Sequence, residues 1–121
     1  RSRLIVLFGC GGDRDHGKRP IMGEIVGRLA DFSILTSDNP RTEDPEAILR
    51  SIEEGMKRTQ GRYVVIENRR EAIKHALKIA QPGDVVLLAG KGHETYQEIM
   101  GEKHPFDEKV VVQELLAELE M

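Results

Sequence analysis

Short apolar runs alternate with segments of helical spacing along the whole chain, and this alternation restricts the fold more than any other feature. Four runs rich in Val, Ile and Leu have the length of buried strands: 3–9, 32–36, 63–66 and 84–89. Between them, apolar residues recur at intervals of three and four, which is typical of helices. Strands that alternate with helices and cross over right-handedly predict an α/β, Rossmann-like fold with a mostly parallel sheet flanked by helices.

Several residues mark where the expected helices begin. Pro20 is expected at the first position of the first helix, with Ile21, Ile25, Val26 and Leu29 following at helical spacing. Residues 96–106 leave a hairpin, an antiparallel edge strand and an irregular loop open as alternatives. Three later helices are expected to begin after a side chain that can accept a hydrogen bond from the first turn: Asp44, Asn68 and Asp107.

Size and composition indicate one globular domain, residues 1–121. The chain begins Arg1-Ser2-Arg3 and enters a strand at once, so we expect it to be a domain of a longer protein. A net charge of −3 with few aromatic residues argues against a nucleic-acid partner, and no apolar run approaches the ~20 residues of a membrane span. The one cysteine, Cys10, excludes an internal disulfide and is expected as a small buried residue, which fits a reducing cytoplasm.

Polar segments follow three of the expected strands at their carboxyl ends. Asp38 to Arg41 follows the second strand, Gly9 to Pro20 the first, and Gly90 to Glu94 the fourth. In a parallel sheet these segments share one edge, where ligands of open α/β folds bind. An aspartate can hold an ammonium group and an arginine can hold a carboxylate in a bidentate pair, so the edge suits an amino acid.

Each of these segments also has a purely structural interpretation. Asn-Pro is a common turn that would leave Arg41 in solvent, and Gly90 to Glu94 can be a glycine turn with solvated charges. Gly12 to Lys18 fits a phosphate loop, but Arg19 stands where Ser or Thr would hold magnesium. No nucleophile–base–acid set and no metal-ligand spacing emerge, so the sequence favours binding over chemistry within this chain.

Four motifs in this order and spacing give the chain a specific resemblance. They are Gly11-Gly12-Asp13-Arg14-Asp15, Gly17-Lys18-Arg19-Pro20, Asp38-Asn39-Pro40-Arg41 and Gly90-Lys91-Gly92-His93-Glu94. Over essentially all 121 residues the chain resembles the C-terminal domain of the Mur ligases of peptidoglycan synthesis. This implies a three-domain cytoplasmic enzyme whose first domain holds the UDP-sugar. Its central domain binds ATP and Mg²⁺, so no catalytic residue is expected in this chain, and the isolated domain is expected to be inactive.

The resemblance is strongest to the branch that adds the third residue of the peptide. It implies that ATP phosphorylates the D-glutamate carboxylate of UDP-N-acetylmuramoyl-L-Ala-D-Glu. The amine of meso-diaminopimelate then attacks the acyl phosphate to give an amide, ADP and phosphate. Asp13 is implied to approach ATP when the domain closes. The residues implied to contact diaminopimelate or to form its recognition motif are Arg14, Asp38, Asn39, Pro40, Arg41, Gly90 and Glu94.

Two alternatives to diaminopimelate ligation stay open. A lysine-adding relative would share the ligase chemistry, but lysine has no distal carboxylate for Arg41, and lysine-adding relatives usually differ at this motif. A non-catalytic Rossmann-like binding module would place the same polar edge in a protein without ATP-dependent chemistry.

Overall fold

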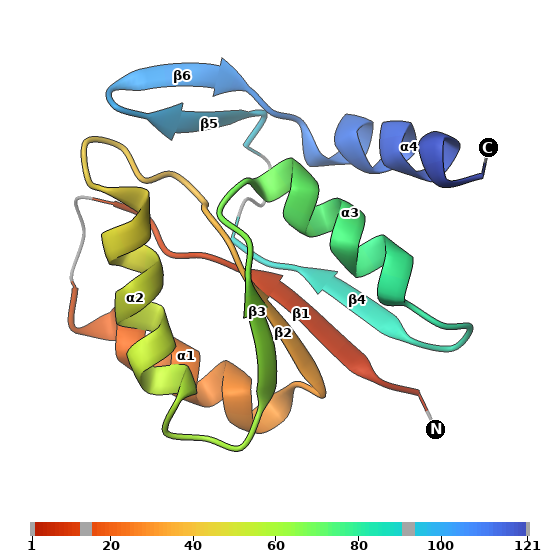
Figure 1. Cartoon of the computed structure of the whole chain (residues 1–121). Helices are drawn as coiled ribbons and strands as arrows, with labels where there is room; N and C mark the ends of the chain where they lie inside the picture. Colours follow the sequence, from red (N-terminus) through yellow and green to blue (C-terminus); the bar gives the residue numbers. More distant parts are fainter. Residues whose placement is uncertain (1, 13–15, 91–93, 121) are drawn as a thin grey trace.

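The computed structural model describes residues 2–12, 16–90 and 94–120 of the chain (Figure 1). The elements alternate as the sequence predicts, apart from a hairpin near the C-terminal end. They are β1 (Leu4–Phe8), α1 (Lys18–Leu29), β2 (Phe32–Leu35), α2 (Pro45–Met56), β3 (Arg62–Val65), α3 (Arg69–Ile79), β4 (Val85–Leu88), β5 (Tyr96–Ile99), β6 (Glu102–Pro105) and α4 (Glu108–Leu119).

The main sheet has four parallel strands in the order β3-β2-β1-β4, which confirms the predicted α/β class. β1 lies inside the sheet, and its side chains alternate between the two faces. Ile5 and Leu7 pack toward α3 and α4, whereas Val6 and Phe8 pack toward α2. The domain therefore has three layers, with apolar cores on both faces of the sheet. None of the helices in these described ranges is long and apolar enough to cross a bilayer.

Side-chain caps fix the starts of three helices, as predicted. The carboxylate of Asp44 accepts from Glu46 N, and the Asn68 side chain accepts from Glu71 N. Asp107 accepts from Lys109 N in the same way. Each cap satisfies one of the amide groups that a helix leaves unpaired in its first turn.

Helix α1 differs from the sequence expectation in both its start and its packed face. It begins at Lys18, so Pro20 lies at its third position, where the missing N–H still costs no helical hydrogen bond. The side buried against α2 carries Gly23 and Gly27 rather than apolar side chains. The larger apolar residues of the helix face outward instead: Ile21, Met22, Ile25 and Leu29.

Glycine explains this arrangement because it lets the two helices approach closely. A Cβ on Gly55 of α2 would overlap the carbonyl of Pro20, and one on Gly23 would overlap the carbonyl of Ile52. Apolar spacing therefore identified the helix correctly but could not identify the face that packs.

Residues 96–106 form an antiparallel hairpin, which settles the alternatives left open by the sequence. β5 pairs with β6 from Tyr96 opposite Pro105 to Ile99 opposite Glu102. The hairpin lies apart from the main sheet, at the top of the view in Figure 1.

At the opposite edge of the sheet, Arg3 and Asp84 join the starts of β1 and β4. The Arg3 guanidinium donates to Asp84 Oδ2 at 2.7 Å and 3.1 Å, and Arg3 N donates to Asp84 Oδ1 at 3.0 Å. Gln81 N donates to the same carboxylate at 2.8 Å. These donors stabilise the charged form and hold the pKa of Asp84 well below its usual value.

We expect acid to remove the stability that this carboxylate provides. A carboxyl group with a lowered pKa in the folded state contributes stability above its unfolded pKa, near 3.8, and loses it as the pH falls further. Asp84→Asn should therefore lower the urea midpoint at pH 7 and reduce the difference between the midpoints at pH 7 and pH 3. Arg3→Met should have the same two effects. If both variants show the same difference between the urea midpoints at pH 7 and pH 3 as the unsubstituted chain, Asp84 is not the source of this acid sensitivity.

Candidate functional site

The carboxyl ends of β1, β2 and β4 bring three polar segments to one edge of the sheet. Gly12 N donates to Asn39 O at 2.7 Å, which joins the first segment to the second. Asn39 Nδ2 donates to Glu94 Oε1 at 3.0 Å, which joins the second to the third. Gly90 also approaches this group, since a Cβ there would lie 3.6 Å from Asp38 Oδ2. The structure thus brings together Asp38 to Arg41, Gly90 and Glu94, and their role as ligands stays a prediction.

Asn39 is the polar centre of this edge. Its residue is only 2% exposed. Both ends of its amide are used, because Nδ2 donates to Glu94 and Oδ1 accepts from Glu98 N at 2.8 Å. Asn39 therefore fixes the orientation of the Glu94 carboxylate and attaches strand β5 to the segment after β2.

Arg41 has an unusual backbone that the hairpin stabilises. Its φ of 55° lies in the left-handed region, which costs an ordinary residue roughly 1–2 kcal/mol. Arg41 N donates to Glu98 O at 2.9 Å, and Arg41 O accepts from Met100 N. A parallel bridge between Arg41 and Ile99 results. The hairpin β5–β6 thus holds Arg41 in a conformation that its own segment would not favour.

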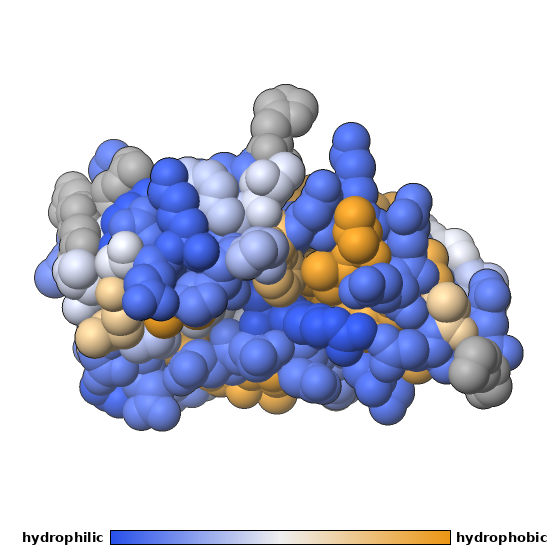
Figure 2. Space-filling view, turned by 90° about the horizontal axis from the view of Figure 1, so that it is seen from above, coloured by the Kyte–Doolittle hydropathy of each residue, from blue (hydrophilic) through white to orange (hydrophobic). Residues whose placement is uncertain are grey.

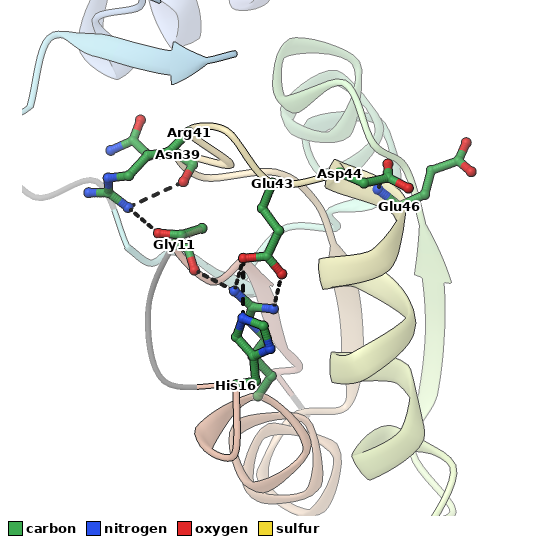
Figure 3. A network of polar contacts seen from close by, with 9 residues as sticks. Gly11, His16, Asn39, Arg41, Glu43, Asp44 and Glu46 are labelled. Atoms are coloured by element: carbon green, nitrogen blue, oxygen red, sulfur yellow. Dashed lines mark hydrogen bonds and ion pairs between the residues drawn. The ribbon is translucent and has the colours of Figure 1, made fainter. Parts of the chain in front are cut away.

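The Arg41 guanidinium is oriented by carbonyl groups at the site (Figure 3). Its Nη1 donates to Gly12 O at 3.1 Å and to Asn39 O at 3.3 Å, and its Nε lies 3.9 Å from Glu98 Oε1. The side chain is 22% exposed, so the group is neither buried nor free in solvent. This contradicts the simple turn interpretation, in which Arg41 would extend into water.

A second arginine, Arg19 of α1, binds the loop after β1. Arg19 is buried, with Nη1 2.6 Å from Glu43 Oε2 and Nη2 donating to Glu43 Oε1 and to Gly11 O. His16 Nε2 lies 3.5 Å from the same carboxylate (Figure 3). These contacts show that Arg19 supports the loop after β1.

The described ends of the Gly12–Lys18 segment do not fit a phosphate loop. Gly12 N is already bonded to Asn39 O, and a Cβ on Gly12 would overlap the Pro40 carbonyl. The glycine therefore serves close backbone packing rather than phosphate binding. Within residues 2–12, 16–90 and 94–120, no group of three His, Cys, Asp or Glu residues could hold a metal ion.

Some predicted site residues lie outside the described residues. These are Asp13 and Arg14 in the first segment and Lys91, Gly92 and His93 in the third. Cys10 lies beside the site and is half-buried rather than buried as the sequence predicts; its partial burial raises the pKa of its thiol, and the charge of Arg19 lowers it less. A raised pKa makes this thiol a weak nucleophile at neutral pH, as expected for a structural cysteine.

Sequence reasoning missed the contribution of the hairpin. Glu98 supplies a backbone donor to Asn39, a backbone acceptor to Arg41 and a nearby carboxylate. No motif signals this role, because two of the three contacts come from the main chain. Seen from above, the side on which the hairpin lies, the molecule presents mostly hydrophilic residues (Figure 2), which suits a charged ligand.

Comparison with known proteins identifies the family. Residues 1–92 match the family described as "Mur ligase, glutamate ligase domain", and the chain therefore belongs to the Mur ligases as a C-terminal domain. It is 62% identical over 119 residues to a "UDP-N-acetylmuramoyl-L-alanyl-D-glutamate--2,6-diaminopimelate ligase" of Caldanaerobacter subterraneus subsp. tengcongensis, covering 98% of this chain and 25% of that protein. A protein of the same name from Alkaliphilus metalliredigens is 57% identical over 116 residues, covering 96% of this chain and 24% of the relative.

A solved structure agrees with these relatives. The structure described as "UDP-N-acetylmuramoyl-L-alanyl-D-glutamate--2, 6-diaminopimelate ligase" superposes with a TM-score of 0.94 at 49% identity. It covers 100% of this chain, and this chain covers 25% of it. The chain thus spans about a quarter of the length of the relatives that it matches.

Proposed function

We propose that this chain is the amino-acid-binding domain of an ATP-dependent ligase that adds meso-diaminopimelate to UDP-N-acetylmuramoyl-L-Ala-D-Glu. The observation that carries the proposal is the joining of Arg41, Asn39 and Glu94 at one sheet edge. This edge offers a guanidinium for a carboxylate and a carboxylate for an ammonium group. An amino acid with two zwitterionic ends can use both, the family match supports a Mur ligase, and the names of the relatives support the same substrate.

Within this proposal, each substrate-binding residue has a role that follows from its chemistry. Arg14 and Arg41 bind carboxylates, Glu94 accepts from an ammonium group, and Gly90 offers backbone groups without a side chain in the way. Asn39 orients Glu94, and the segment Asp38-Asn39-Pro40-Arg41 forms the recognition motif. Asp13 approaches ATP when the domain closes, which excludes water that would hydrolyse the acyl phosphate.

The catalytic groups are proposed to lie elsewhere in the same polypeptide. Residues 1–121 form one domain, while N-terminal and central domains bind the UDP-sugar, ATP and Mg²⁺. Mur ligases are ATP-dependent, whereas no group of three His, Cys, Asp or Glu residues in the described part of this chain could hold a metal ion. Both ATP and the UDP-linked substrate are cytoplasmic metabolites, so we place the reaction in the cytoplasm.

An apolar surface supports the proposal that other parts of the polypeptide contact this domain. Among the described strands β4 pairs only with β1, and its Val85 and Leu87 are 57% and 50% exposed. Ile25 and Leu29 of α1 are 51% and 72% exposed. An apolar edge strand left open in this way would promote aggregation unless it is covered.

The proposal is tested by following ligation in the full-length protein by mass spectrometry. The UDP-muramoyl dipeptide would be offered with diaminopimelate or lysine, each with and without ATP. ATP-dependent product with diaminopimelate, at a kcat/KM far above that with lysine, is the expected result, together with no product from the 121-residue chain by itself. A preference for lysine would indicate the lysine-adding branch, and no product from folded protein would favour a non-catalytic binding module.

A further inference from the structure

A buried guanidinium, that of Arg69, connects three elements behind the candidate site. Arg69 is the first residue of α3, and its side chain is 0% exposed. Its Nη1 donates to Ser37 O at 3.0 Å, its Nη2 to Ala89 O at 3.0 Å, and its Nε to Glu108 Oε2 at 2.7 Å. The guanidinium therefore binds the ends of β2 and β4 and the first turn of α4 at once.

This position is electrostatically unfavourable for a cation without such partners. The first turn of a helix carries partial positive charge, and a buried charge without partners is costly. The Glu108 carboxylate and the two carbonyl groups offset both costs. The planar fork of the guanidinium reaches all three acceptors at once, which the single ammonium group of lysine could not do in the same geometry. A role in holding a defined geometry explains why a long charged residue is placed here.

The two carbonyl partners lie immediately before the two segments that hold the substrate in our proposal. Ser37 precedes Asp38, and Ala89 precedes Gly90. In the sheet order β3-β2-β1-β4, these strand ends flank β1 and do not pair with each other. Arg69 is thus a direct polar link across β1 between the backbones of the two segments.

The third partner extends the link to the hairpin. Glu108 follows Asp107 at the junction of β6 and α4, where Phe106 N donates to Thr95 O at 2.8 Å. The same hairpin holds Asn39 and Arg41 through Glu98. The groups that position the candidate site therefore meet at one buried side chain.

We infer that Arg69, together with Glu108, is a positioning residue that sets the separation between the segment 38–41 and the residues Gly90 and Glu94, and thereby the selectivity for an amino acid with two charged ends. This inference rests on the proposed function. Diaminopimelate must meet both segments at once, so a shift of one against the other weakens its binding. Lysine lacks the distal carboxylate and depends less on that separation, while ATP is bound elsewhere.

The test uses the full-length ligase with Arg69→Lys and Glu108→Gln, and with Arg70→Lys as the matched control. Arg70 is the next residue of α3, is partly exposed and pairs with Glu118, away from the strand ends. Arg69→Lys should raise the KM for diaminopimelate roughly 10-fold to 100-fold, as misplaced binding groups do. It should lower the diaminopimelate-to-lysine ratio of kcat/KM and leave the KM for ATP within about twofold. Glu108→Gln should shift the same ratio less, and Arg70→Lys should leave it unchanged.

The outcomes separate the inference from the proposed function. Folded Arg69→Lys enzyme with unchanged selectivity, or with equal losses for every substrate, overturns the positioning role. If Arg69→Lys does not fold, an unchanged ratio in Glu108→Gln overturns it instead. If the unsubstituted enzyme forms no diaminopimelate product in the same assay, the proposed function fails and this inference fails with it.

Discussion

Replacing Arg41 by alanine in the full-length ligase is expected to abolish most of its use of diaminopimelate while sparing its use of ATP. The guanidinium is already held by Gly12 O and Asn39 O, so it meets a substrate carboxylate with little loss of freedom. Removing one partner of such a charge pair costs about 2–5 kcal/mol, or roughly 30-fold to several thousand-fold in kcat/KM. Steady-state kinetics with each substrate varied in turn would measure the two effects separately.

Two further variants assign the Arg41 effect to the guanidinium. Arg50→Ala changes the net charge equally but removes only an exposed pair with Glu46. The values of kcat/KM for diaminopimelate and for ATP should therefore stay near those of the unsubstituted enzyme. In Arg41→Gly the glycine can adopt the backbone φ of 55° without strain. This variant should nevertheless lose as much kcat/KM for diaminopimelate as Arg41→Ala does. A loss shared equally by ATP and diaminopimelate would show that Arg41 has no specific role.

The parts of the fold that were predictable depend on local chemistry. The four apolar runs form β1 to β4 as predicted, but only β1 and β2 are covered on both faces, since Val85 and Leu87 of β4 remain half-exposed. Asp44, Asn68 and Asp107 cap their helices because a short acceptor side chain needs only its own neighbouring amides. The convergence of three segments at one edge followed from parallel strand order alone.

The parts that were missed depend on contacts between residues far apart in the sequence. The packed face of α1 carries glycines, and a pattern of apolar residues cannot reveal a face defined by missing side chains. Arg19 and Arg69 read as charged residues in polar segments, yet both are buried. The packing of three or four elements decides which carbonyl groups a guanidinium reaches. A short stretch of sequence does not contain this information.

Replacing Asn39 by alanine is expected to destabilise the 121-residue chain and to disorganise the candidate site together. The substitution removes the donor to Glu94 Oε1 and the acceptor for Glu98 N, and both partners are partly buried. Leaving a fully buried polar group without its partner costs about 1–3 kcal/mol, and because water reaches these two partners in part, we expect the combined loss near the lower end of about 2–6 kcal/mol. Urea unfolding of the chain would measure this loss.

Asn68→Ala is the matched control, since it removes the same side chain from an exposed helix cap. That change should cost about 0.5–2 kcal/mol, because Asn68 serves only as the cap of the first turn of α3. In the full-length ligase Asn39→Ala should raise the KM for diaminopimelate, since Glu94 loses the amide that orients it and the hairpin loses an attachment to the segment that carries Arg41. If Asn39→Ala is no more destabilising than Asn68→Ala, the amide is a replaceable surface contact, and the joined edge on which the proposed function rests is not held together in the way described.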